Sequence, residues 1–231
     1  MKRFWKSVSV EGSESGWTVQ LDGRPVKTPA RAALELPNEK LAGAIAEEWR
    51  AVGETIDPRA MPMTGLANAA IDRVAADPAT FAAGLARYAE ADLLCYRAGG
   101  PQVLVARQAE AWDPLLAWAR RRYDVDFVVT DGVVHVPQPA ATVEQLEHAV
   151  AALDPFRLAG LSRLVTIGGS LVAALSVLEK AVATEAAWEA VSLDERWQLE
   201  QWGADAEAKT ALDLRRDDFL AGAAFLALLD Q

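Results

Sequence analysis

Three residues of this chain carry side chains that together could break a bond: Asp92, Cys95 and His135. A cysteine beside a base, with a carboxylate to orient that base, is a recurrent arrangement in nucleophilic catalysis. The spacing does not favour it, because Cys95 is flanked by two leucines and a tyrosine, and a reactive thiolate needs a nearby base or a helix N-terminus. We expect Cys95 to be a small buried hydrophobic residue. A small cytoplasmic hydrolase or transferase using these three residues stays the alternative function.

Metal chemistry has little support in the sequence. His135 and His148 are the two histidines, and they are separated by thirteen residues, one expected on a strand and the other on a helix. They form no HExxH or HxH pattern that would place two ligands on one metal ion. We therefore expect no metal site and no cofactor.

The carboxylate of Asp92 falls on or beside the apolar face marked by Leu85 and Tyr88. A buried carboxylate without a partner costs several kcal/mol, so it must be paired or act in catalysis. Arg97 or Arg73 could supply the pairing. The favoured interpretation is structural, with Asp92 in an ion pair with Arg97 or Arg73 that locks helices together, and a catalytic acid is the alternative.

A segment near the C-terminus has the composition of a binding surface. Trp197 and Trp202 stand among the acids Glu200, Asp205 and Glu207, with no lysine or arginine between them. Tryptophan contributes much of the contact energy in protein interfaces, and acids add steering and specificity. On an ideal helix the two indoles point about 60–100° apart, so at least one tryptophan and one acid can face outward together. The alternative is that both tryptophans belong to the core and the acids form an ordinary solvated face.

Composition narrows the class of partner. The chain has 231 residues, 52% of them hydrophobic, and a net charge of −10. Residues 184–231 hold eleven acidic and four basic side chains, whereas residues 1–60 are neutral. This balance argues against nucleic-acid and anionic-membrane binding, which need basic patches. A single cysteine fits a reducing compartment. The apolar run 164–178 is shorter than the ~20 residues of a membrane span and predicts a buried helix.

The first third of the chain reads as β-structure. Alternating apolar residues at 8–10 and 17–21 lead into Asp22-Gly23, a strong hairpin-turn signal. A helix is predicted after Asn38, a plausible N-cap, with Leu41, Ile45 and Trp49 on one apolar face.

Beyond residue 60 the signals are helical. Four Asp-Pro pairs predict helix starts at 57–58, 77–78, 113–114 and 154–155, and Thr142 and Ser192 begin two further capping-box patterns. A second hairpin is predicted near 127–136, and a packed helix near the C-terminus. The sum is an α+β fold: a small antiparallel β domain over residues 1–60 and a larger, mostly helical domain over residues 61–231.

Seven ordered stretches resemble one known family along nearly the whole chain. They are Leu21–Pro29, Ala46–Trp49, Asp57-Pro58 with Met61-Pro62, Tyr88 with Asp92–Arg97, Arg107-Gln108, Trp112–Pro114 and Trp197–Ala208. They are similar to the assembly chaperones of the F-type ATP synthase that hold the free alpha subunit. Several motifs in order and at matching spacing are more specific than any one of them.

The resemblance implies an N-terminal β domain, a C-terminal helical domain, no catalysis and no cofactor. It also implies a partner, the unassembled alpha subunit, which the chaperone protects from aggregation until the beta subunit replaces it. The acids tied to this role match Glu200 and Asp205, on either side of Trp202. By the same resemblance the chain acts in the bacterial cytoplasm, or in the mitochondrial matrix if it is a processed form. We expect no nucleic-acid, membrane or small-molecule partner.

Overall fold

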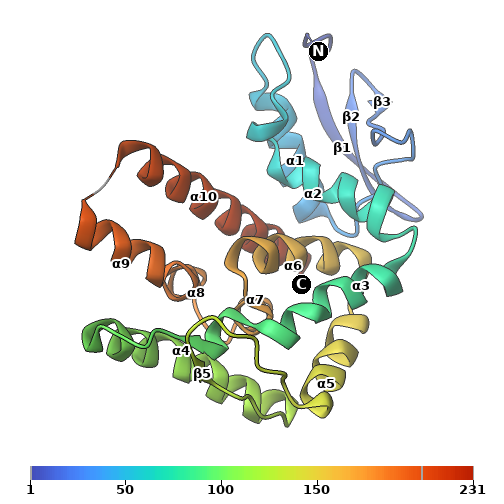
Figure 1. Cartoon of the computed structure of the whole chain (residues 1–231). Coiled ribbons are helices and arrows are strands. Elements are labelled where there is room, and N and C mark those ends of the chain that lie inside the picture. Colours follow the sequence, from blue (N-terminus) through green and yellow to red (C-terminus); the bar gives the residue numbers. More distant parts are fainter. Residues whose placement is uncertain (1, 204, 231) are drawn as a thin grey trace. The chain divides into compact units, whose positions relative to one another are not determined.

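The computed structural model describes residues 2–203 and 205–230 and confirms the α+β class (Figure 1). Its contacts divide the chain into two compact units. The first contains residues 1–78, 154–160 and 224–231, and the second contains residues 79–153 and 161–223. The first unit therefore includes residues 61–78 and two returning helix ends, in addition to the expected N-terminal domain. The boundary near residue 60, as a boundary between domains, stays a prediction.

The sheet of the first unit consists of three antiparallel strands in the order β1-β2-β3. Strands β1 (Val8–Ser13) and β2 (Gly16–Leu21) pair from Val8 opposite Leu21 to Ser13 opposite Gly16. The predicted turn at Asp22-Gly23 connects β2 to β3 (Arg24–Pro25). Both turn residues have positive φ, +49° and +74°, as a two-residue hairpin loop between twisted strands requires.

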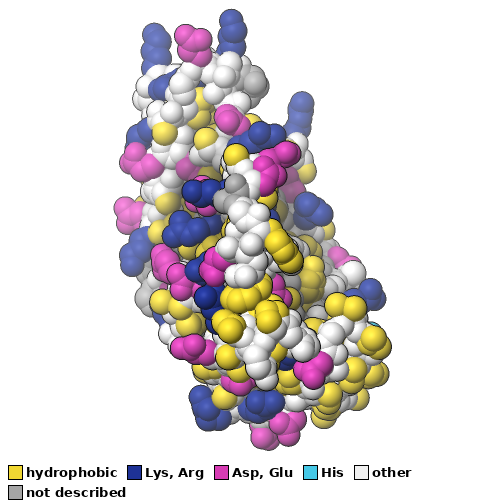
Figure 2. All heavy atoms as spheres, turned by 60° about the vertical axis from the view of Figure 1, so that its left-hand side comes forward, with side chains coloured by type: hydrophobic (Ala, Val, Ile, Leu, Met, Phe, Trp, Pro, Cys, Tyr) yellow, Lys and Arg dark blue, Asp and Glu magenta, His cyan; other side chains and the backbone are white. Residues whose placement is uncertain are grey.

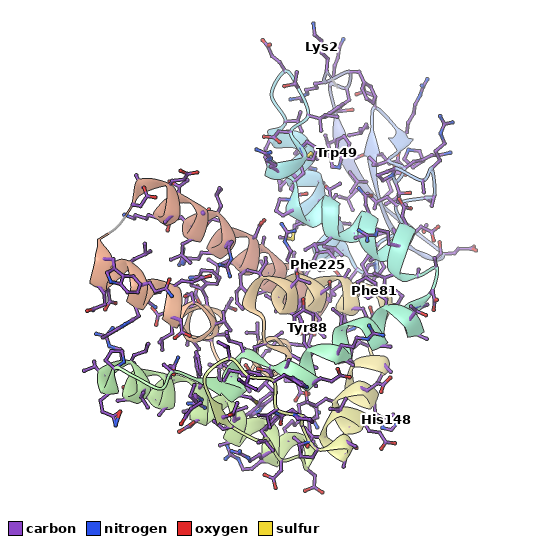
Figure 3. All side chains as sticks on the ribbon, viewed as in Figure 1. Lys2, Trp49, Phe81, Tyr88, His148 and Phe225 are labelled. Atoms are coloured by element: carbon purple, nitrogen blue, oxygen red, sulfur yellow. The ribbon has the colours of Figure 1, made fainter. Side chains whose placement is uncertain are left out.

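Helix α1 (Glu39–Ala51) packs on β1 and β2, and its predicted start is confirmed. The Asn38 side chain accepts a hydrogen bond from the Leu41 amide at 2.9 Å, which satisfies one of the free N–H groups of the first turn. The apolar face is buried as expected. Trp49, labelled in Figure 3, is buried and contacts the ring of Trp5 edge-on with centroids 5.1 Å apart, and its structural role stays a prediction.

The next helical segment begins where a distant carboxylate caps it. Glu48 accepts hydrogen bonds from the amides of Met63 at 2.7 Å and Thr64 at 2.8 Å, at the start of α2 (Pro62–Ala69), which continues as a π-helical turn over Ala70–Val74. A short 3₁₀ helix (Pro58–Ala60) precedes it. The C-terminal helix returns to this unit, where the Asn38 amide donates to the Leu228 carbonyl at 2.9 Å.

The second unit is almost entirely helical. It contains α3 (Pro78–Ala86, from Ala79 onward), 3₁₀ helices over Arg87–Ala91 and Leu93–Cys95, α4 (Gln102–Tyr123), α5 (Ala140–Ala151), most of α6 (Pro155–Gly168), α7 (Leu171–Leu178), α8 (Thr184–Val191), α9 (Leu193–Trp202) and most of α10 (Ala206–Leu229). Trp112 of α4 lies at the centre of its core, fully buried, and its indole N–H donates to the Ala190 carbonyl at 2.7 Å.

The predicted hairpin at 127–136 is wrong. Only Thr130–Asp131 is a strand, β5, and it pairs in parallel with β4 (Tyr96–Arg97) instead of folding back on its own sequence. Gly132 follows with φ of +85°, and its amide donates to the Arg97 carbonyl. The local turn signal was therefore overridden by pairing with a segment more than thirty residues earlier.

Two predicted helix starts are also wrong, and a third lacks its predicted cap. Asp113-Pro114 lies inside α4, not at its beginning. Thr142 does not cap α5, because its hydroxyl donates to the Asp126 carbonyl at 2.6 Å. The start predicted at Ser192 is confirmed, since α9 begins at Leu193, but the Ser192 hydroxyl donates to the Trp188 carbonyl at 2.7 Å and provides no side-chain cap. In each case a competing local or tertiary hydrogen bond, or continued packing, outweighs the local pattern.

The apolar run 164–178 is buried as expected, but it is not one helix. It divides between α6 and α7 at Gly169, whose φ of +67° ends the first helix, and Ser170 caps the second by accepting from the Ala173 amide. None of the described helices is both long and apolar enough to cross a membrane.

Candidate functional site

Helix α9 is the element that positions the tryptophan–acid segment. None of its ten residues, all described, is buried. It ends at Gly203, whose φ of +86° and ψ of 148° occur almost only in glycine. Its first turn is held by Asp194, which accepts from the Gln108 amide at 2.7 Å, and by an ion pair between Glu195 and Arg215. The helix therefore lies on the surface of the second unit, held mainly by polar contacts.

The two tryptophans of α9 have different environments. Trp202, on the last turn, is 80% exposed, the highest exposure of any large aromatic side chain among the described residues. Trp197 is half-buried, and the guanidinium of Arg107 lies over its ring at 4.8 Å from the centroid. The outward tryptophan that the sequence allowed is thus Trp202, and the other packs against an arginine of α4.

The acids around Trp202 also differ. Glu200 pairs with Arg107, with 2.6 Å between its Oε2 and Nη1, and both side chains are half-exposed. Asp205 is exposed and accepts from the Glu207 amide at 3.2 Å at the start of α10. Glu207 is exposed as well. On an ideal helix Ala204 would share a face with Trp197 and Glu200, but it lies outside the described residues.

The side chains of this surface are of the types that bind another protein. An exposed indole with solvent-accessible carboxylates near it in the sequence can bury apolar area and accept hydrogen bonds from a basic or amide-bearing partner. Figure 2 turns this side of the helices toward the viewer and shows acidic and basic side chains interspersed with exposed apolar groups. We call Trp202, Glu200, Asp205 and Glu207 the tryptophan–acid surface. Their roles in binding, and that of Trp197, stay predictions.

Arg107 is the residue of this site for which sequence reasoning predicted no role. It belongs to a stretch that resembles the family, but its partner Glu200 is 93 residues away and no local pattern connects them. The adjacent Gln108 is buried and bridges the Ala98 amide to Asp194. The pair of residues thus fixes α9 to α4 from two successive positions.

Asp92 and Arg97 do not form the expected ion pair. The Asp92 carboxylate is fully buried and accepts from the amides of Leu94 and Val172, each at 3.0 Å. Arg97 instead pairs with Asp113 at 2.7 Å. Burial raises the pKa of Asp92 to about 6, against the opposing effect of the backbone hydrogen bonds. Asp92 thus joins its segment to α7 through backbone amides, and the structural roles of Asp92 and Arg97 stay predictions.

The residues of the alternative enzyme are not arranged for catalysis. Cys95 is fully buried, and burial, followed by the charge of Asp92, raises the pKa of its thiol to about 12. His135 is exposed, and its ring nitrogen contacts the Tyr96 hydroxyl at 3.2 Å. A protonated, enclosed thiol is a poor nucleophile. Within residues 2–203 and 205–230, no cluster of His, Cys, Asp and Glu side chains has the geometry of a metal site.

The sequence and the structure were compared with those of known proteins. A sequence model of the family described as ATP12 chaperone protein matches residues 2–120, which is more than half of the chain. The chain belongs to the ATP12 chaperone family. Members of this family are non-enzymatic assembly factors of the F1 ATP synthase, so the hydrolase or transferase interpretation is wrong.

Similar proteins come from bacteria and mitochondria. The crystal structure of Atp12 from Paracoccus denitrificans is 44% identical with a TM-score of 0.94, covering 99% of this chain and 98% of that one. A putative chaperone from Agrobacterium tumefaciens is 38% identical with a TM-score of 0.94, over 99% and 86% of the two chains. The mitochondrial protein atp12 of Schizosaccharomyces pombe is 26% identical over 90% of this chain and 75% of its own length. An aspartate-to-lysine mutant of the Paracoccus protein has the same fold.

Proposed function

We propose that this ATP12 chaperone binds the unassembled alpha subunit of the F-type ATP synthase, prevents its aggregation and releases it to the beta subunit. The observation that carries the proposal is Trp202, which is 80% exposed at the end of a surface helix with Asp205 and Glu207 beside it. A large exposed aromatic side chain is unfavourable in water, and such residues are typical anchors of protein interfaces.

The physical requirements of temporary binding support this role. A subunit that awaits its ring neighbours exposes an apolar interface, so its holder must cover that interface and still yield to the true neighbour. A small anchor with acidic surroundings meets both needs, because apolar area supplies affinity and charge supplies orientation and specificity. The acidic balance of residues 184–231 fits a basic or donor-rich face on the alpha subunit. We place this activity in the bacterial cytoplasm or the mitochondrial matrix, in line with the sources of the relatives.

Co-expression tests the choice of subunit. The chaperone is produced with the alpha subunit alone and with the beta subunit alone, and the soluble fraction of each is measured with and without the chaperone. We expect alpha, and not beta, to become soluble and to co-purify. Addition of purified beta to the chaperone–alpha complex should then release the chaperone. Retention of beta in place of alpha would overturn the proposal.

A charge reversal tests the surface. Asp205→Lys should abolish capture of alpha, because it places a cation where a basic partner face docks. Asp217→Lys is the matched control, since Asp217 is also exposed, lies on α10 and has no ion-pair partner among the described residues. Equal capture by the two variants would show that the tryptophan–acid surface is not the binding site.

A further inference from the structure

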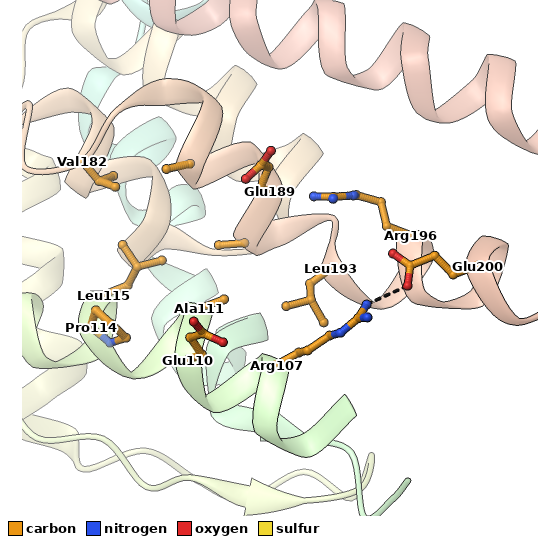
Figure 4. A pocket seen from close by; sticks show the side chains of 12 residues that line it. Arg107, Glu110, Ala111, Pro114, Leu115, Val182, Glu189, Leu193, Arg196 and Glu200 are labelled. Atoms are coloured by element: carbon orange, nitrogen blue, oxygen red, sulfur yellow. Dashed lines mark hydrogen bonds and ion pairs between the residues drawn. The ribbon is translucent and has the colours of Figure 1, made fainter. Parts of the chain in front are cut away.

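A groove runs along the side of α9 that faces α4 and α8. It has a volume of about 410 Å³, and its floor is apolar, formed by Ala111, Pro114, Leu115, Val182, Ala186 and Leu193. Figure 4 shows these side chains with the charged residues of the rim around them. Leu115 is buried, but Ala186 is exposed at the groove, so the apolar floor is open to solvent. The volume is sufficient for one large apolar side chain and its neighbours.

Arg107 closes one end of this groove. Its guanidinium reaches from α4 to Glu200 on α9, the ion pair drawn in Figure 4, and lies over the ring of Trp197. The Arg107 guanidinium thus lies between the Glu200 carboxylate and the Trp197 indole. A carboxylate and an aromatic ring both attract a guanidinium. Glu200 is also the residue that connects the groove to the tryptophan–acid surface.

We propose that this groove receives an apolar side chain of the alpha subunit and that an adjacent arginine or lysine of alpha replaces Arg107 on Glu200. The inference rests on the proposed function and specifies the chemistry of the segment recognised. Arg107 is then an internal stand-in for the partner's cation, which keeps Glu200 paired while the chaperone is empty.

Charge complementarity favours this occupant. Glu110 and Glu189 line the same groove, and neither has an ion-pair partner among the residues that the structure describes. Arg196 is the other cation of the rim. Once Arg107 leaves Glu200, three carboxylates face the groove with Arg196 alone to oppose them. An incoming segment with one or two basic side chains beside an apolar one satisfies both the floor and the rim.

The exchange is also suited to reversible binding. Half-exposed ion pairs contribute little net free energy, so replacement of one guanidinium by another costs little in either direction. Helix α9 can adjust to the occupant because none of its side chains is fully buried. Affinity then comes from the apolar contact, and the cation decides which segment fits.

Filling the groove tests the proposal. Ala186→Phe places a ring over the apolar floor from an exposed position, so the fold should be unaffected. Ala106→Phe is the matched control: Ala106 is exposed on α4 beside Arg107 but does not line the groove. We expect Ala186→Phe to weaken binding of the alpha subunit by at least about tenfold, the effect of losing one anchor contact, and Ala106→Phe to bind as the parent does. Circular dichroism of both variants confirms folding.

Two more variants keep the test decisive if Ala186→Phe does not fold. Glu110→Lys adds a cation to the rim and should weaken binding severalfold. Arg107→Gln removes the internal competitor and should bind alpha at least as tightly as the parent, with a larger dependence on ionic strength because the new ion pair on Glu200 no longer replaces an existing one.

The outcomes separate this inference from the proposed function. If the parent captures alpha, Asp205→Lys does not, and Ala186→Phe or Glu110→Lys binds as well as the parent, then alpha docks on the tryptophan–acid surface and the groove proposal is overturned. Loss of capture in Arg107→Gln would overturn the stand-in role, because Arg107 would then contact the partner itself. If the parent captures no alpha, both proposals fail.

Discussion

At the scale of single residues, burial decides the chemistry of the two groups that looked reactive. Asp92 and Cys95 lie three positions apart and both are fully enclosed. The same loss of water raises the pKa of each, to about 6 for the carboxyl and about 12 for the thiol. The thiol therefore stays protonated at neutral pH, which is the opposite of what a thiolate nucleophile requires, and Asp92 keeps its proton up to about pH 6.

Asp92 predicts a pH dependence of stability. Its pKa is higher in the folded protein than the ordinary value of 3.8, so the folded state binds this proton more tightly than the unfolded chain does. The stabilisation is complete below about pH 3.8 and is lost as the pH rises through about 6. Asp92→Asn lacks this titration. From pH 4 to pH 8 the parent should therefore lose roughly 2–3 kcal/mol more of its free energy of unfolding than Asp92→Asn does. Urea unfolding of both proteins across this range measures it, and parallel pH profiles would contradict it.

Cys95 predicts slow thiol chemistry. Because its thiol is buried and protonated at pH 8, alkylation by iodoacetamide should proceed only through opening of the structure, at a rate far below that of the urea-unfolded protein. Mass spectrometry of the labelled protein over time provides the measurement. A native rate close to the unfolded rate would show that Cys95 is accessible.

At the scale of elements, two glycines in helices predict opposite effects of the same substitution. Gly84, in α3, is exposed, and a Cβ there would meet nothing within 4 Å. Gly84→Ala should raise the free energy of unfolding by about 0.5–1 kcal/mol through helix propensity. In α6, a Cβ on Gly160 would lie 2.6 Å from Leu226 Cδ2. Gly160→Ala should lower stability by about 1–3 kcal/mol because the packing must shift. Denaturant melts of the pair test this, and two changes of the same sign would contradict it.

The elements also show what a sequence can and cannot predict. The Asp22-Gly23 turn, the Asn38 cap and the stripe from Leu41 to Trp49 depend on neighbours a few residues apart, and all were predicted correctly. The segment 127–136 has equally strong local signals, yet its strand pairs with Tyr96–Arg97. Local preference predicts an element well where tertiary partners agree with it, and fails where a distant strand offers better hydrogen bonds.

The same distinction applies to the candidate site. The exposure of Trp202 follows from its place at the end of a polar helix before Gly203, so the outward tryptophan was within reach of the sequence. The pairing of Arg107 with Glu200 spans 93 positions, and the Asp92 contact with the Val172 amide spans 80. Such contacts depend on how helices pack, which spacing along the chain does not encode.

At the scale of the whole molecule, the net charge of −10 predicts how the chaperone meets its partner. Attraction between this charge and a basic face accelerates association and is screened by salt. Raising NaCl from about 50 mM to about 500 mM should slow association with the alpha subunit by about tenfold or more and leave dissociation nearly unchanged. Stopped-flow or surface-based kinetics at several salt concentrations test this. Association that does not depend on salt would contradict a charge-guided encounter.

We expect the exposed indole of Trp202 to anchor the alpha subunit. The affinity of the alpha subunit for single-residue variants of the chaperone tests this most directly. Trp202→Ala is compared with Leu214→Ala, a control that also truncates an exposed apolar side chain, 62% exposed, on the neighbouring α10. We expect Trp202→Ala to weaken binding of alpha by about thirtyfold, a loss of about 2 kcal/mol, and Leu214→Ala to bind as the parent does, with both variants equally folded. Unchanged affinity in Trp202→Ala, or equal losses in the two variants, would contradict the account.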